Sequence, residues 1–95
     1  MEFGSFREYL FMLARDKRLT VWHISVLFAI MQLCQQDDVF GTTIFISRAK
    51  VMRLARIKSA MTYHKCMAQL QQYGYVLYLP SYHPEVGSRV FLLAN

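Results

Sequence analysis

The feature that most constrains the fold is a change of apolar spacing at Gly74. Before it, four residues recur at the three- and four-residue spacing of one helical face: Tyr63, Cys66, Met67 and Leu70. After it, the β-rich runs 75–79 and 89–93 flank a stretch containing Pro and Gly, a pattern typical of a hairpin with an extended tip. Gly74 stands where the end of a helix favours a left-handed residue. We therefore predict a helix over about 60–73, followed by a two-stranded hairpin.

Two longer helices are predicted in the N-terminal half. The first, about 5–16, has an apolar face made of Phe6, Tyr9, Leu10 and Leu13. The second, about 21–36, follows Thr20, which is a suitable N-cap. Its apolar stripe consists of Ile24, Leu27, Phe28, Met31 and Cys34, widened by Val26, Ile30 and Leu33. So broad an apolar surface predicts a central helix. Residues 1–5 resemble a cloning-site remnant and receive no structural weight.

The middle of the chain carries shorter elements. Residues 44–46 are rich in β-formers and long enough for one edge strand. A short helix follows at about 48–54, and its predicted inward residues are Val51 and Leu54. The turn 55–58 then leads into the helix at about 60–73. Two serines are predicted to cap these helices: Ser47 and Ser59.

Length and composition favour a single folded domain. The 95 residues are 55% hydrophobic and 15% aromatic, which suits a packed core and argues against intrinsic disorder. The longest apolar runs fall far short of the ~20 residues that cross a bilayer. We find no secretory leader pattern, so we expect a cytoplasmic protein without a membrane partner. Two cysteines, Cys34 and Cys66, are expected to be reduced and buried.

Positive charge is concentrated in the C-terminal half. From Ser47 onward there are seven Lys or Arg residues and one Glu, whereas the first 46 residues contain four Lys or Arg and five Asp or Glu. Between Asp38 and Glu85 there is no carboxylate at all. Such one-sided charge favours a surface that meets a polyanion, most often nucleic acid. A merely solvated basic face is the alternative.

The element order is that of a winged helix-turn-helix domain, a mainly α fold with a small β hairpin (α+β). Residues 59–70, SAMTYHKCMAQL, and then Gly74-Tyr75-Val76 resemble the recognition-helix signature of winged-helix bacterial regulators such as the GntR and MarR groups. That signature has a capping Ser, a Thr three residues later, apolar residues leading to Leu, and a Gly-apolar-apolar step into the wing. Residues 47–55 look like the partner helix of the same unit.

The resemblance covers about residues 20–93 and sets the domain expectations. It implies a winged helix-turn-helix domain over 20–95, preceded by an N-terminal extension and helix over 1–19. The aromatic, Pro-rich wing also looks like that of small regulators associated with bacterial mobile elements. Implied functions are therefore transcriptional regulation or an accessory role in a mobile element.

Double-stranded DNA is the partner that this resemblance implies, with the helix at about 59–73 in the major groove and the wing, 75–93, on the backbone. On the outward side of that helix, Lys65 is suited to guanine acceptors and Gln69 to adenine. Met61 is suited to a thymine methyl group. Lys65 and Gln69 would otherwise be ordinary solubilising residues on an exposed helix face.

Phosphate contacts are expected around that groove. Ser59 and Thr62 stand at the helix start, where exposed N–H groups also favour anions. The flanking cations predicted to bind phosphate are Arg48, Lys50, Arg53, Arg56 and Lys58. Arg89, at the base of the wing, is a candidate for the adjacent backbone or the minor groove.

Enzymatic and metal-binding functions are poorly supported. The histidines His23, His64 and His83 are scattered along the chain, so an acid–base set is hard to assemble. His64 and Cys66 stand two apart on a helix and point in different directions, so they could not share one ion. We therefore predict no enzyme activity, no cofactor, no metal and no small-molecule ligand.

Protein partners remain open from the sequence. The N-terminal helix could pack on the domain or pair with its copy in a homodimer, which would double the phosphate contacts on a palindromic site. The alternative function is a protein-interaction module in which hairpin aromatics bind a partner: Tyr75, Tyr78, Tyr82 and Phe91. RNA binding is a third and weaker possibility.

Overall fold

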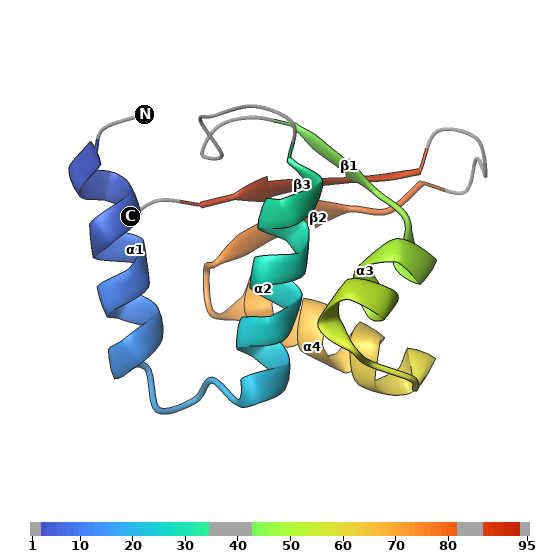
Figure 1. Ribbon diagram of the computed structural model, residues 1–95, viewed down its shortest axis with the longest axis horizontal. Coiled ribbons are helices and arrows are strands. Elements are labelled where there is room, and N and C mark those ends of the chain that lie inside the picture. Colours follow the sequence, from blue (N-terminus) through green and yellow to red (C-terminus); the bar gives the residue numbers. More distant parts are fainter. Residues whose placement is uncertain (1–2, 35–42, 82–86, 94–95) are drawn as a thin grey trace.

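The protein has a mainly helical α+β fold with one small antiparallel sheet. The computed structural model describes residues 3–34, 43–81 and 87–93, and the side chains of α1 from Arg7 onward. In chain order the elements are α1 (Phe3–Arg15), α2 (Val21–Leu33), β1 (Ile44–Ile46), α3 (Arg48–Ala55), α4 (Ala60–Gln72), β2 (Val76–Leu79) and β3 (Ser88–Leu92). Figure 1 shows the strands together on one side and α2, α3 and α4 gathered on the other. This agrees with the predicted α+β class and with the predicted order of helices and strands.

Side-chain caps determine where three helices begin. Ser47 Oγ accepts a hydrogen bond from Lys50 N–H (3.1 Å), and Ser59 Oγ accepts one from Thr62 N–H (3.3 Å). Both predicted caps are therefore confirmed. Thr20 also caps α2, as predicted, and its own N–H donates to the ring of His23 in a reciprocal arrangement.

The predicted helix ends differ from the observed ones by a few residues. α1 already begins at Phe3, so part of the segment that received no structural weight is helical. α2 ends at Leu33 rather than near residue 36, because Cys34 adopts an extended backbone (ψ 125°). None of the helices in the described residues is long and apolar enough to cross a membrane.

The three strands are ordered β1-β3-β2, with β3 in the middle. β1 pairs antiparallel with β3, so that Phe45 lies opposite Arg89. β2 pairs with the other side of β3, where Leu77 lies opposite Phe91. The predicted edge strand is confirmed, and it extends the predicted hairpin to a three-stranded sheet.

The core lies between the sheet and the helices, with α2 in a central position. Its main buried side chains are Val26, Leu27, Ile30, Val51, Tyr63, Met67, Leu70, Val76, Val90 and Leu92. Two of the predicted inward residues are wrong: Phe28 is 45% exposed and Leu54 is 38% exposed. α2 buries the face that carries Val26, Leu27 and Ile30, which turns Phe28 outward. In place of Leu54, the turn residue Ile57 enters the core.

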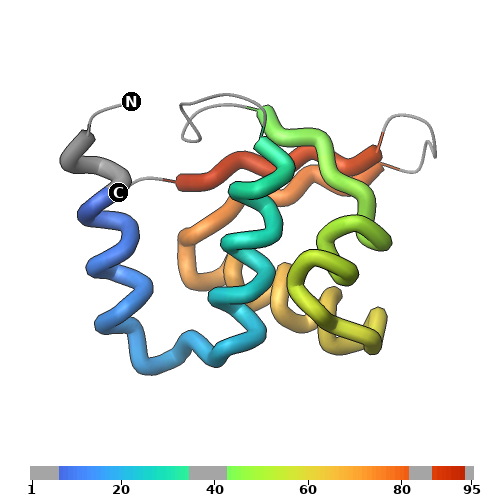
Figure 2. The backbone as a smooth tube through the Cα atoms, viewed as in Figure 1, coloured from blue at the N-terminus to red at the C-terminus, as the bar shows by residue number. Residues whose placement is uncertain are grey.

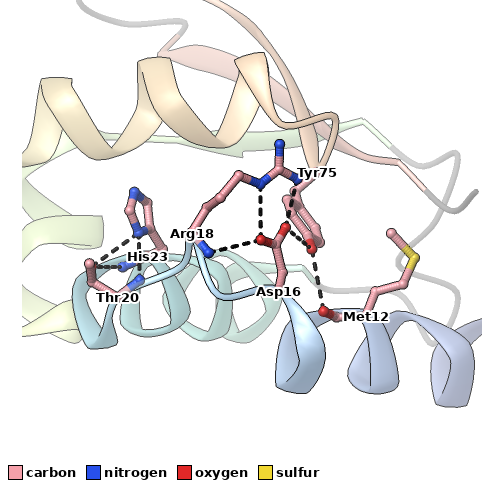
Figure 3. Close-up of polar contacts among 6 residues, drawn as sticks. All are labelled: Met12, Asp16, Arg18, Thr20, His23 and Tyr75. Carbon is pink, nitrogen blue, oxygen red and sulfur yellow. Dashed lines mark hydrogen bonds and ion pairs between the residues drawn. The ribbon is translucent and has the colours of Figure 1, made fainter.

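α1 packs on the rest of the domain through a tyrosine pair. Tyr9 is buried and its hydroxyl donates to the carbonyl of Tyr75 (3.2 Å), while the two rings meet edge to face. The Tyr75 hydroxyl donates to the carboxylate of Asp16 at 2.8 Å (Figure 3). Leu13 completes the buried side of the helix. In Figure 2 α1 lies at the opposite end of the molecule from α3.

Candidate nucleic-acid interface

Six basic side chains are displayed on α3, α4 and the turn between them. We call them the basic cluster: Arg48, Lys50, Arg53, Arg56, Lys58 and Lys65. Every one of them is exposed. Among the described residues the ion pair found is that of Arg18 with Asp16, so the cluster has no carboxylate partner there. Its charge is therefore available to an external anion.

The turn between α3 and α4 has a specific backbone geometry. Arg56 adopts the left-handed conformation (φ 62°, ψ 38°), and its N–H donates to the carbonyl of Arg53 at 3.3 Å. Ile57 N–H donates to the carbonyl of Met52 (2.8 Å), and its buried side chain anchors the turn. For a residue other than Gly, this conformation costs about 1 kcal/mol. Arg56 therefore places an exposed guanidinium at a backbone position that glycine would adopt without strain.

The outward side of α4 is well defined. Tyr63, Cys66, Met67 and Leu70 are buried, as predicted. The opposite side consists of exposed residues at helical spacing: Met61, His64, Lys65, Ala68 and Gln72. Met61 is 81% exposed, more than any other large apolar side chain in the described residues. Ala68 was missed from the sequence, although its spacing of three from Lys65 could have revealed it. Its small side chain permits close approach of another molecule to the helix.

Gln69 lies apart from this outward surface. It is half-buried, and its Oε1 lies 2.7 Å from His23 Nε2. His23 Nδ1 accepts the N–H of Thr20, so the ring proton lies on Nε2 and donates to Gln69. This contact ties the start of α2 to α4. Since its carbonyl oxygen is already bonded, we leave Gln69 out of the interface that we propose.

The start of α4 combines a cap with exposed polar groups. Ser59 is exposed and its oxygen accepts the N–H of Thr62, whose side chain is half-buried. The α4 N-terminus carries the partial positive charge of the helix, with Lys58 exposed directly before it. This arrangement is suited to an anion.

Arg89 lies on β3 and not on the helices that carry the basic cluster. It is exposed in β3 and lies directly opposite Phe45 on β1 and Leu79 on β2. Val90, its neighbour in the strand, points into the core, so Arg89 points to the opposite side of the sheet. The predicted tip residues Tyr82 and His83 lie outside the described residues.

Under α4, the hydroxyl of Tyr63 is buried and forms no hydrogen bond with the described residues. Burial raises the pKa of Tyr63, and the nearby Tyr78 adds to the rise. Tyr78 donates its own hydroxyl proton to Ser88 Oγ (3.3 Å). Burial also raises the pKa of the Cys66 thiol, although Lys65 acts in the other direction. The Tyr63 hydroxyl and the Cys66 thiol therefore stay protonated at neutral pH.

The other predicted functional groups are not assembled into a site. Among the described residues there is no group of three or more His, Cys, Asp or Glu side chains that could hold a metal. Tyr75 is buried and Tyr78 is half-buried, so neither offers the aromatic surface predicted for a protein partner. Phe91, on β3, is half-buried on the same side of the sheet as Arg89.

One groove lies at the far side of the molecule, beside α1. It has a volume of about 580 Å³ and is lined by Glu8, Phe11, Met12, Arg15, Asp16, Arg18, Tyr73 and Tyr75. The guanidinium of Arg18 is held by Asp16 (2.7 Å) and lies over the ring of Tyr73 (Figure 3 shows the ion pair). Two acidic and two basic residues line it, so it has no net charge. The groove thus lacks the anion preference of the basic cluster.

No protein-family model, no curated protein and no solved structure matches the chain at a significant level.

Proposed function

We propose that the chain is a winged helix-turn-helix protein that binds double-stranded DNA. In this proposal α3, the turn and α4 form the helix-turn-helix, α4 enters the major groove, and the β2–β3 hairpin is the wing. The observation that supports the proposal is the basic cluster, because all six of its side chains are exposed on α3, α4 and the turn between them. The proposed role is that of a transcriptional regulator or a mobile-element accessory factor.

The residues divide into two kinds of contact. The cations of α3 and the turn, together with the N-terminus of α4, bind phosphates. These contacts set the orientation of the protein on the duplex. Lys65 and Met61 then meet base edges, where ammonium recognises guanine and a thioether side chain packs on a thymine methyl. Exposed Ala68 lets α4 lie deep enough for these contacts. His64 is a further candidate, because it is exposed between Met61 and Lys65.

Salt dependence tests whether the contact is electrostatic. Each phosphate contact contributes about −0.9 to the slope of log K against log salt concentration. Four contacts from the basic cluster would give a slope of about −3.6, or roughly 100-fold weaker binding between 50 and 200 mM salt. Fluorescence anisotropy with a labelled random duplex measures this slope directly.

Charge-removing variants test where the duplex lies. Arg53→Gln should weaken binding and reduce the slope by about 0.9, because Arg53 contacts phosphate in this proposal. Lys65→Gln should weaken binding without that loss of slope, because Lys65 contacts a base edge. Lys17→Gln is the matched control, since Lys17 is an equally exposed cation near α1. If all three variants bind like the parent, or if Lys17→Gln has the larger effect, the proposed placement is wrong.

Sequence specificity needs a separate measurement. Selection of bound sites from random duplexes gives the preferred site. Lys65→Ala should then lose about 1–3 kcal/mol of discrimination at one base position, whereas Arg53→Ala should weaken all duplexes alike. Equal losses on every sequence for Lys65→Ala would rule out base recognition by this residue.

A further inference from the structure

The side of the sheet that faces away from the helices is apolar. In β3, Val90 and Leu92 point into the core, and Arg89 and Phe91 therefore point away from it. The residues on this side, which we call the outer sheet face, are Phe45, Leu77, Leu79, Arg89 and Phe91. Phe45 is 57% exposed and Leu77 is 42% exposed. Four of the five residues are apolar.

This pattern departs from that of a sheet with one side in water. In such a sheet, strands alternate between apolar residues toward the core and polar residues toward solvent. Here the solvent-side positions are occupied by large apolar side chains on all three strands. Phe45 and Leu77 are exposed, and Leu79 and Phe91 are half-buried beside them. Apolar side chains gathered in this way on a surface are typical of interaction sites. The basic cluster, in contrast, is carried by α3, α4 and the turn between them.

The register places a single charge among these apolar side chains. Phe45, Arg89 and Leu79 form one row across the three strands, and Phe91 and Leu77 form the next. Arg89 is exposed and has no ion-pair partner in the described part of the chain. A partner that covers this face must supply a carboxylate, because an unpaired guanidinium buried in an interface is costly.

Charge argues against a second copy of this chain as the occupant. A twofold interface through the outer sheet face would bring Arg89 close to its own counterpart. The described residues 43–81 and 87–93 contain no carboxylate that could separate the two charges. We therefore take the occupant to be a different protein, and self-association through this face is an outcome of the test.

The dimensions of the face favour a helix. Three strands span two spacings, about 10 Å in total. An α-helix with its side chains is about 10 Å across, so one helix can cover the width of the sheet. Helix-on-sheet packing of this kind is a standard way to bury an apolar sheet face.

We propose that the outer sheet face docks an amphipathic helix of another protein, one with an apolar ridge interrupted by a single Asp or Glu that pairs with Arg89. This is a second interaction surface, and it does not depend on DNA binding. Leu77, Leu79, Phe45 and Phe91 contact the ridge. Arg89 sets the position and direction of the helix through its ion pair.

The test uses two designed helical peptides of about 18 residues and the full chain labelled with ¹⁵N. Both peptides carry Leu at helical spacing, and they differ only in having Glu or Lys at one position within that ridge. We expect the Glu peptide to shift the amide signals of β1, β2 and β3, and to bind at least about fivefold more tightly than the Lys peptide. The variant Arg89→Glu should reverse the preference.

Two further variants control for folding and for nonspecific hydrophobic binding of the peptide. Leu77→Thr keeps a β-former in the strand and should weaken the Glu peptide by about tenfold. Val21→Thr removes a more exposed apolar residue on α2 and should leave binding unchanged. Peptide shifts confined to α1 or α2, or equal affinity for both peptides, would overturn the proposal. So would self-association that Leu77→Thr abolishes, because a second copy would then cover the face.

Duplex binding distinguishes a failure of the helix-docking proposal from a failure of the DNA-binding proposal. The parent chain and Leu77→Thr should bind a random duplex equally, since the outer sheet face lies away from α4. If duplex DNA shifts the signals of Phe45 and Leu77 as the Glu peptide does, the face is a DNA contact and the helix-docking proposal fails. Loss of duplex binding alone, with peptide docking intact, contradicts only the DNA-binding function.

Discussion

The variant Tyr63→Phe should make the protein more stable. The Tyr63 hydroxyl is buried without a hydrogen-bond partner in the described residues. Folding therefore removes its hydrogen bonds to water without replacing them. Burying such a group costs about 1–3 kcal/mol. Phenylalanine keeps the ring and its packing under α4. We therefore expect the free energy of unfolding to rise by about 1 kcal/mol, the lower end of that range.

Tyr9→Phe is the matched control, because it makes the same chemical change at another buried tyrosine. The Tyr9 hydroxyl donates to the carbonyl of Tyr75 (3.2 Å), so its removal leaves that acceptor without this bond. The free energy of unfolding should fall by about 1 kcal/mol. Urea unfolding followed by circular dichroism measures both, and thermal midpoints should move about 4–8 °C in opposite directions. A loss of stability in Tyr63→Phe would show that its hydroxyl is bonded in the folded protein.

Three further predictions follow from the turn, the tyrosine pair and α1. The variant Arg56→Gly should be about 1 kcal/mol more stable to urea unfolding than Arg56→Ala, because alanine is strained at the left-handed backbone conformation of this position (φ 62°) and glycine is not. Both variants should weaken duplex binding equally. Burial, and then the hydrogen bond to Asp16, raise the pKa of Tyr75 to about 12. Below pH 10 the Tyr75 hydroxyl is protonated in both the folded and the unfolded protein. Between pH 10 and pH 12 only the unfolded chain loses this proton, so the free energy of unfolding should fall over that range. Denaturation at each pH measures the fall, which should be smaller in Tyr75→Phe. Sedimentation at micromolar concentration should show a dimer that Leu10→Glu dissociates, and a single 11.2 kDa species for the parent would contradict the dimer.

Local signals made most of the fold predictable. Ser47, Thr20 and Ser59 cap their helices through bonds to residues three positions later, so their roles can be deduced from short stretches of sequence. The buried side of α4 follows from helical spacing alone. Gly74 has φ 87°, the left-handed backbone that its position after α4 predicted.

What the sequence could not supply are contacts between distant residues. Gln69 was predicted to face outward, yet its amide bonds His23, which stands 46 positions earlier. α1 could not be assigned to the core or to a partner, because Tyr9 and Tyr75 are 66 positions apart. The spacing of residues along one helix predicts which of its sides is apolar and which is polar. It does not predict which other helices or strands each side contacts.

The candidate interface was predicted more fully than the sheet surface. The basic cluster lies within one short stretch, 48–65, and its exposure follows from charge, so its members could be named in advance. The outer sheet face combines residues from three strands, and only the pairing of β1 with β3 places Phe45 beside Arg89. An apolar run such as 44–46 predicts a strand without showing which of its sides is covered.

The position of β3 in the sheet has a consequence for synthesis of the protein. Among the described strands the middle one comes after the other two in the sequence, so β1 and β2 have no partner until residues 88–92 become available. A nascent chain can form its helices first, but both strand pairings must wait until residues 88–92 have left the ribosome. Chains stalled before residue 88 would expose two unpaired strands to aggregation and proteolysis.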